Sequence, residues 1–171
     1  KEAFKYYKQG DLNSSLKYCS SFISKGYKDV QLFSQYGIIL FELGYIEKSI
    51  DTFERSIIIY PNEPNLYINL SNVYQLNGNF TKSEFLIRKS LELFPKSHIA
   101  LSNLSLILIK TKKFIEAEKY ALIALEIDPQ NSNYYYMDII ITQDSYYFVH
   151  KNFIDIFEEN NEELIFVREN K

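Results

Sequence analysis

The sequence is poor in the residues from which most catalytic and metal sites are built. Its 171 residues include one cysteine, two histidines, one methionine and no tryptophan. A single cysteine excludes a disulfide framework, and the aromatic neighbours Tyr18 and Phe22 predict that Cys19 is a buried, structural thiol. One thiol is compatible with a reducing compartment, which slightly favours the cytoplasm and leaves the localisation unknown.

Strong charge and long apolar runs are also missing. The formal net charge is −3 and the isoelectric point is about 5.5, whereas nucleic-acid-binding domains carry a basic stripe and a high isoelectric point. No apolar stretch reaches the roughly 20 residues that a transmembrane helix needs. We therefore expect no nucleic-acid partner and no membrane insertion, while a hydrophobic content of 46% is ample for a packed core.

The familiar catalytic and cofactor motifs are absent as well. The sequence contains no Gly-rich phosphate or dinucleotide loop, no GxSxG elbow and no HExxH pair. His98 and His150 lie far apart, without a cysteine or second histidine at ligand spacing, so we interpret them as surface or capping residues. The carboxylate-rich stretch 156–164 is interpreted as a solvated helix end. We therefore predict no catalytic residue, no metal site, no cofactor and no enzymatic activity.

What the sequence does have is an internal period of 34 residues. Glycines recur at this spacing, with a lysine in the next position of the series: Gly10, Gly44, Gly78 and Lys112. Prolines follow the same period, at Pro61, Pro95 and Pro129. Small residues do so too, at Ser15, Ser49, Ser83 and Ala117. A fixed period of this length indicates a solenoid of repeated units.

Each period has the pattern of two amphipathic helices joined by a turn. In residues 66–74 and 80–93 apolar side chains recur at helical spacing, and an Asn-Gly-Asn break separates the two stretches. Glycine at the turn supplies the left-handed backbone that ends a helix, and proline follows the second helix because it cannot continue one. Lys112 replaces this glycine, which costs about 1 kcal/mol if the backbone there is left-handed.

Period and pattern together resemble the tetratricopeptide repeat, in which an aromatic residue, a Leu-Gly pair, a tyrosine, small residues and a proline hold fixed positions. One unit carries this pattern at Tyr67, Leu70, Ser71, Tyr74, Gly78, Ser83, Ile87, Ser90 and Pro95. We divide the array, 1–131, into a partial repeat at 1–29 and full repeats at 30–63, 64–97 and 98–131. The resemblance implies an all-α fold, a right-handed α-solenoid of antiparallel helix pairs.

The pattern decays after residue 131. We expect residues 132–171 to hold a degenerate repeat, with irregular capping helices at 133–144 and 147–158 and a tail, because a solenoid must cover its last apolar face. The partial first repeat begins inside its first helix, which would leave Phe4 and Tyr7 exposed. Exposed apolar side chains of this kind suggest self-association through the N-terminal repeat.

The resemblance also implies where a ligand binds. In tetratricopeptide repeat proteins the first helix of each unit lines the concave face, which receives extended peptides or the ends of partner chains. The residues that the repeat phase assigns to this face are Gln35, Ile38, Asn65, Ile68, Asn69, Asn72, Gln75, Ile99, Asn103 and Leu106.

Two features of this face indicate the kind of ligand. Asn69 and Asn103 occupy the same position in successive units, with Gln35 one unit earlier, and amide side chains can pair with an extended peptide backbone. The alternative is that asparagine is simply common in this composition. Chaperone-binding members of the family clamp an acidic tail with Lys and Arg, but the matching positions here hold Asn65, Asn69, Ile99 and Asn103. We therefore expect no acidic-tail chaperone clamp.

Two functions are compatible with the residues and the resemblance. The first is a non-catalytic scaffold that binds an extended peptide or partner segment on its concave face, with a protein or peptide as its ligand. The second is a substrate- or partner-recruiting arm of a larger enzyme, such as a glycosyltransferase or sulfotransferase, whose catalytic domain lies outside this chain. The full open reading frame would separate the two.

Overall fold

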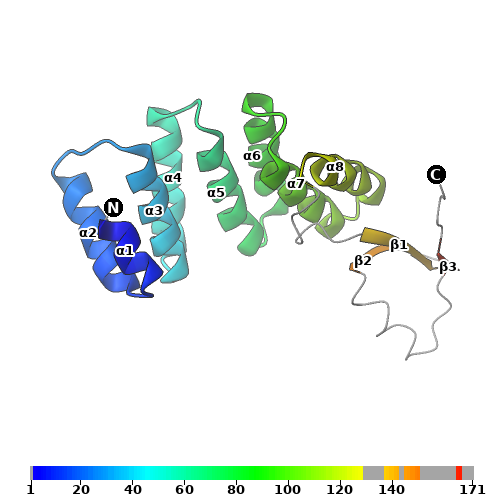
Figure 1. Ribbon diagram of the computed structural model, residues 1–171, viewed down its shortest axis with the longest axis horizontal. Helices are drawn as coiled ribbons and strands as arrows, with labels where there is room; N and C mark the ends of the chain where they lie inside the picture. The colour runs from blue at the N-terminus through cyan, green and yellow to red at the C-terminus, as the bar shows by residue number, and fades with distance from the viewer. Residues whose placement is uncertain (1, 129–136, 143–144, 151–164, 167–171) are drawn as a thin grey trace. The chain divides into compact units, whose positions relative to one another are not determined.

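The computed structural model describes residues 2–128, 137–142, 145–150 and 165–166 (Figure 1). The chain divides into two compact units, Lys1–Pro95 and Lys96–Lys171. Six helices lie in the first unit: α1 (Glu2–Lys8), α2 (Leu12–Ser24), α3 (Val30–Glu42), α4 (Ile46–Ile59), α5 (Pro64–Leu76) and α6 (Phe80–Leu93). The second unit contains α7 (His98–Lys110), α8 (Phe114–Ile127) and three short strands.

Consecutive helices pack as pairs. In the first unit α1 contacts α2, α3 contacts α4 and α5 contacts α6, and the pairs stack through α2 against α3 and α4 against α5. In the second unit α7 and α8 form the same kind of pair. Over the described residues up to 128, this arrangement confirms the predicted helical solenoid.

The turns within the pairs have the predicted backbone. Gly10, Gly44 and Gly78 end the first helices of their pairs with φ of +76°, +81° and +78°. Lys112 has φ of 60° at the same position between α7 and α8, and it is the one non-glycine residue with positive φ in the described part of the chain. The predicted left-handed conformation of this lysine is therefore confirmed, and its side chain makes the turn less favourable than a glycine would.

The recurring small residues lie where the two helices of a pair touch. Ser15, Ser49 and Ser83 are fully buried, and each donates a hydrogen bond to a carbonyl of the preceding helix. The acceptors are the carbonyls of Ala3 (2.7 Å), Gly37 (2.7 Å) and Ser71 (2.9 Å). Serine therefore does two things at these positions, because it keeps the side chain short and also ties the helix pair together with a buried hydrogen bond.

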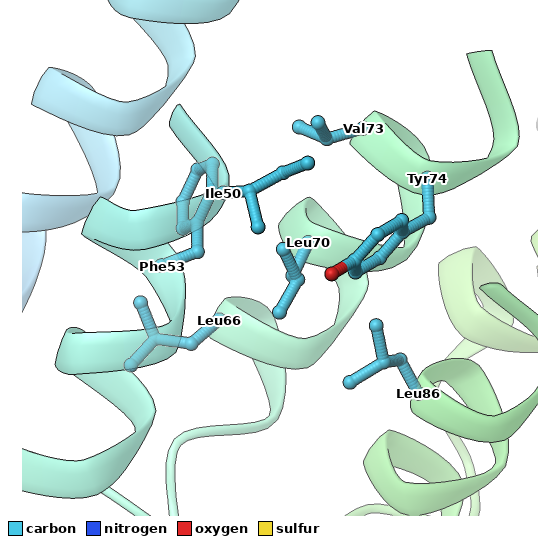
Figure 2. Packing of buried hydrophobic residues seen from close by; sticks show 7 residues of the cluster. All are labelled: Ile50, Phe53, Leu66, Leu70, Val73, Tyr74 and Leu86. Carbon is cyan, nitrogen blue, oxygen red and sulfur yellow. The ribbon is translucent and has the colours of Figure 1, made fainter. Parts of the chain in front are cut away.

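Bulky side chains fill the space around these contacts. Phe53 of α4 is fully buried, and a Cβ atom on Gly37 would lie 2.6 Å from its ring. In Figure 2, Phe53 and Ile50 of α4 lie beside Leu66 and Leu70 of α5, which links two consecutive pairs. The absence of a side chain on Gly37 is what allows the ring to sit against α3.

The prediction of capping helices after residue 131 is wrong where the structure describes these residues, because they form strands. Met137–Thr142 is strand β1, Ser145–His150 is β2 and Ile165–Phe166 is β3. They pair antiparallel in the order β2-β1-β3, with Ile140 opposite Tyr147. Runs of isoleucine and aromatic residues favour strands, and only two residues separate β1 from β2, as in a tight hairpin. The rest of the two expected helices, 133–136, 143–144 and 151–158, lies outside the described residues.

Candidate functional site

The predicted binding residues of the first unit lie on two helices that contact each other, α3 and α5. Gln35 and Ile38 belong to α3, where both side chains are half-buried. Ile38 also packs against the core cluster that contains Phe53, so part of its role is structural. On this helix Gln35 is therefore the better candidate for contact with a ligand.

A stripe of amide side chains runs along α5. Asn65 is exposed, and Asn69, Asn72 and Gln75 are half-buried. Their spacing of three or four residues places them on one side of the helix. Ile68 lies among them in the sequence but is only 5% exposed, which leaves little of its surface for a ligand.

Exposed apolar side chains accompany the amide residues on both α5 and α7. Leu76 at the end of α5 is 71% exposed. The sequence analysis did not include it, although an apolar residue that follows the buried positions of α5 could have been recognised as an exposed one. In α7, Ile99 and Leu106 are 49% and 47% exposed, with the half-buried Asn103 between them. The expected row from Gln35 through Asn69 to Asn103 crosses from one unit to the other, so its continuity stays a prediction.

These helices carry almost no charge. Helix α5 has no ionisable Asp, Glu, Lys or Arg, and α3 has one, Glu42, in its last position. Glu42 accepts a hydrogen bond from the Tyr7 hydroxyl (2.5 Å), and this bond together with burial raises the pKa of Tyr7 to about 12. The amide stripe is thus suited to hydrogen bonding rather than to ion pairing.

Cys19 and Tyr74 are titratable groups whose contacts lie within the packed helices. Cys19 is fully buried, and burial raises the pKa of its thiol to about 11, which makes it a poor nucleophile and confirms the predicted structural thiol. Tyr74 donates to Glu54 (3.0 Å) and accepts from Lys82 (3.3 Å), a cluster that joins α4, α5 and α6. Burial raises the pKa of Tyr74. Within the described ranges no three His, Cys, Asp or Glu side chains gather as a metal site would require.

Four other predictions concern described residues. Phe4 is 51% exposed, as self-association would need, whereas Tyr7 is half-buried and bonded to Glu42. His98 lies 3.0 Å from the Asp128 carboxylate, across the ends of α7 and α8. None of the described helices is long and apolar enough to cross a membrane. His150 ends β2.

The sequence profile of the tetratricopeptide repeat family matches residues 64–97 and 99–131. These two stretches are tetratricopeptide repeats. The two matched stretches contain α5, α6, α8 and all of α7 except His98. They include eight of the ten predicted binding residues, all except Gln35 and Ile38.

Solved tetratricopeptide repeat structures share the fold. The crystal structure of MamA is 21% identical, superposes with a TM-score of 0.68, and the match covers 77% of this chain and 77% of that chain. The first TPR of Spaghetti (RPAP3), bound to the HSP90 peptide SRMEEVD, is 22% identical with a TM-score of 0.59, over 61% of this chain and 83% of that one. At these identities the similarity shows the fold alone.

One curated relative is an enzyme. Protein O-mannosyl-transferase F38B6.6 of Caenorhabditis elegans is 26% identical over 94 residues, which are 55% of this chain and 14% of that protein. The chain thus spans a small part of that protein's length.

Proposed function

We propose that this tetratricopeptide repeat chain is a non-catalytic scaffold that binds an extended segment of a partner protein across α3 and α5. The amide stripe of α5 supports this proposal most directly, because Asn65, Asn69 and Asn72 lie on one side of a helix that carries no Asp, Glu, Lys or Arg. Each amide offers donors and an acceptor, as a peptide backbone does. Each hydrogen bond formed in this way contributes about 0.5–1.5 kcal/mol.

The exposed apolar side chains indicate which kind of side chain the ligand carries. Leu76 ends the amide stripe of α5, and Ile99 and Leu106 lie on α7 in the second unit. A ligand that buries such side chains gains about 25 cal/mol for each Å² of apolar surface removed from water. We therefore propose a ligand with apolar side chains on a hydrogen-bonded backbone.

An acidic chaperone tail does not fit this proposal. The HSP90 peptide in the similar Spaghetti (RPAP3) structure carries adjacent glutamates. Here Asn65 and Asn69 stand on α5 and Ile99 and Asn103 on α7 at the positions that the family uses for a basic clamp. We expect calorimetric titration with a Glu-Glu-Val-Asp peptide to show no tight binding, and submicromolar affinity would contradict the proposed neutral ligand.

The proposal is tested by a quantitative pull-down from a lysate of the source cell, read by mass spectrometry. The bait is compared with the double variant Asn65→Ala, Asn69→Ala and with the control Asn13→Ala, which removes an exposed amide from α2. Circular dichroism first establishes that all three baits fold. We expect specific partners to be lost from the double variant and kept by the control. Partners kept by both variants would place the binding surface elsewhere.

A second candidate function is the recruiting arm of a larger enzyme. The similarity to part of an O-mannosyl-transferase favours it, since the matched 94 residues are a minor portion of that protein. The full transcript of the gene tests this candidate. A catalytic domain encoded in the same reading frame would support it, and a reading frame that encodes only repeats would contradict it.

A further inference from the structure

The first unit contains a cavity that the amide stripe does not use. It is lined by residues of α2, α3 and α4 and has a volume of about 300 Å³. Ile23, Phe33, Tyr36 and Leu40 supply its apolar lining. We call it the α2–α4 pocket. Its volume is at the lower end of the range of about 300–1,000 Å³ that is typical of ligand pockets.

The next repeat shows which side chain would normally fill such a space. Leu86 of α6 is 9% exposed and belongs to the core cluster with Leu70 and Tyr74. Figure 2 shows its side chain close to those of α5. In that repeat, a leucine from the second helix therefore completes the packing against the first.

The first full repeat lacks this leucine. The residue 34 positions before Leu86 is Thr52, and it lines the pocket together with Tyr36 and Leu40. Threonine is shorter than leucine, and its hydroxyl donates to the carbonyl of Lys48 (2.7 Å). The apolar lining is therefore left open at the place where a leucine side chain is buried one repeat later.

Polar groups at the pocket are mainly cationic. Lys48, Asp51 and Arg55 line it from one side of α4, and Asp51 is paired with Arg55 (2.8 Å). Lys48 makes no ion pair with a described residue, and its ammonium lies 5.1 Å from the ring centre of Tyr45. The lining residue from α2 is the apolar Ile23, so this wall adds no opposing charge. A partner segment with carboxylates complements this surface.

We propose that the α2–α4 pocket binds a leucine-like side chain of a partner protein, presented by a segment with flanking carboxylates. The aliphatic side chain takes the place that Leu86 fills in the next repeat, and a carboxylate lies beside the ammonium of Lys48. This surface is separate from the amide stripe of α5. An experiment can therefore contradict the proposed pocket without contradicting the proposed peptide face, and the reverse.

A short synthetic peptide tests the pocket directly. The probe is N-acetyl-Glu-Asp-Leu-Asp-Glu-amide, titrated into the ¹⁵N-labelled chain to millimolar concentration and followed by NMR. We expect the backbone amides of the pocket residues in α3 and α4 to shift. Replacing the central leucine of the probe by alanine should weaken binding at least about tenfold. Replacing its four carboxylates by amides should weaken binding about threefold to fivefold.

Two substitutions at one position separate occupation of the pocket from a general effect on the fold. Thr52→Leu fills the space with the chain's own side chain, so it should raise the unfolding midpoint and abolish the shifts. Thr52→Ser leaves the space open and should preserve them. Equal shifts in Thr52→Leu and the natural chain, no shifts at millimolar probe, or shifts confined to α5 would each overturn the proposal.

Discussion

At the scale of single residues, buried serines form hydrogen bonds where the two helices of a pair touch. Ser83 donates to the Ser71 carbonyl, and the two hydroxyls lie 2.9 Å apart. In the last pair alanine stands at the matching position, Ala117, and the buried hydroxyl of Ser105 has no partner among the described residues. A buried hydroxyl without a hydrogen bond is destabilising.

Ala117→Ser should therefore stabilise the chain. A hydroxyl at this position can bond to Ser105 as Ser83 does to Ser71, and we expect a gain of about 0.5–1.5 kcal/mol. The thermal unfolding midpoint, followed by circular dichroism, should rise by about 2–4 °C for each kcal/mol. Ser83→Ala is the matched control and should shift the midpoint downwards. A lower midpoint for Ala117→Ser would show that the hydroxyl does not fit.

The left-handed turn at Lys112 gives a second prediction at this scale. Lys112→Gly removes the Cβ that crowds a backbone with φ of 60° and should stabilise the chain by about 1 kcal/mol. Lys112→Ala removes the same charge but keeps the Cβ, so it should leave the unfolding midpoint nearly unchanged. If both variants shift the midpoint equally, the charge of Lys112 and not its backbone conformation is responsible.

At the scale of elements, the contact between α3 and α4 depends on one missing side chain. Gly37→Ala would place a Cβ 2.6 Å from the ring of Phe53, which is fully buried and cannot move aside freely. We expect a loss of about 1–3 kcal/mol in the free energy of unfolding. Denaturation by urea measures this loss. Phe53→Leu in the Gly37→Ala background should recover part of it, and independent, additive losses would contradict the steric explanation.

The contact between α1 and α3 should depend on pH. The Tyr7 pKa is raised from 10.0 to about 12 by its hydrogen bond to Glu42 and by burial, so the folded chain favours the protonated phenol. The stabilising contribution of this contact is fully present below pH 10 and is lost as the pH rises through 12. Unfolding midpoints between pH 9 and pH 12 should fall more steeply for the natural chain than for Tyr7→Phe. Parallel curves would contradict this assignment.

At the scale of the whole molecule, the sequence predicted the features that recur in each helix pair. It missed the features that depend on how neighbouring helices are spaced and on where the repeat pattern stops. Small residues, turn glycines and the left-handed Lys112 follow from the 34-residue period because each helix pair needs them at the same place. The hydrogen bonds of the serines and the burial of Ile68 could not be predicted, since they depend on the spacing of neighbouring helices. The strands β1 and β2 were missed because the helical period was extended into residues whose composition favours strands.

Self-association is also a property of the whole molecule. Phe4 on α1 is 51% exposed, and we expect this apolar side chain to contribute to pairing between two copies of the chain. Sedimentation velocity should then show a concentration-dependent dimer that Phe4→Ser weakens. A monomer at all concentrations would dismiss this prediction without affecting the proposed peptide face.

We propose above all that the amide side of α5 contacts the partner. Once pull-down has named a partner, a peptide from its binding segment can be titrated into the ¹⁵N-labelled chain. We expect the side-chain amide resonances of Asn65, Asn69 and Gln75 to shift together and to saturate with the same affinity. Saturable binding that leaves these three resonances in place, and shifts only residues of α2, α4 or α6, would contradict it.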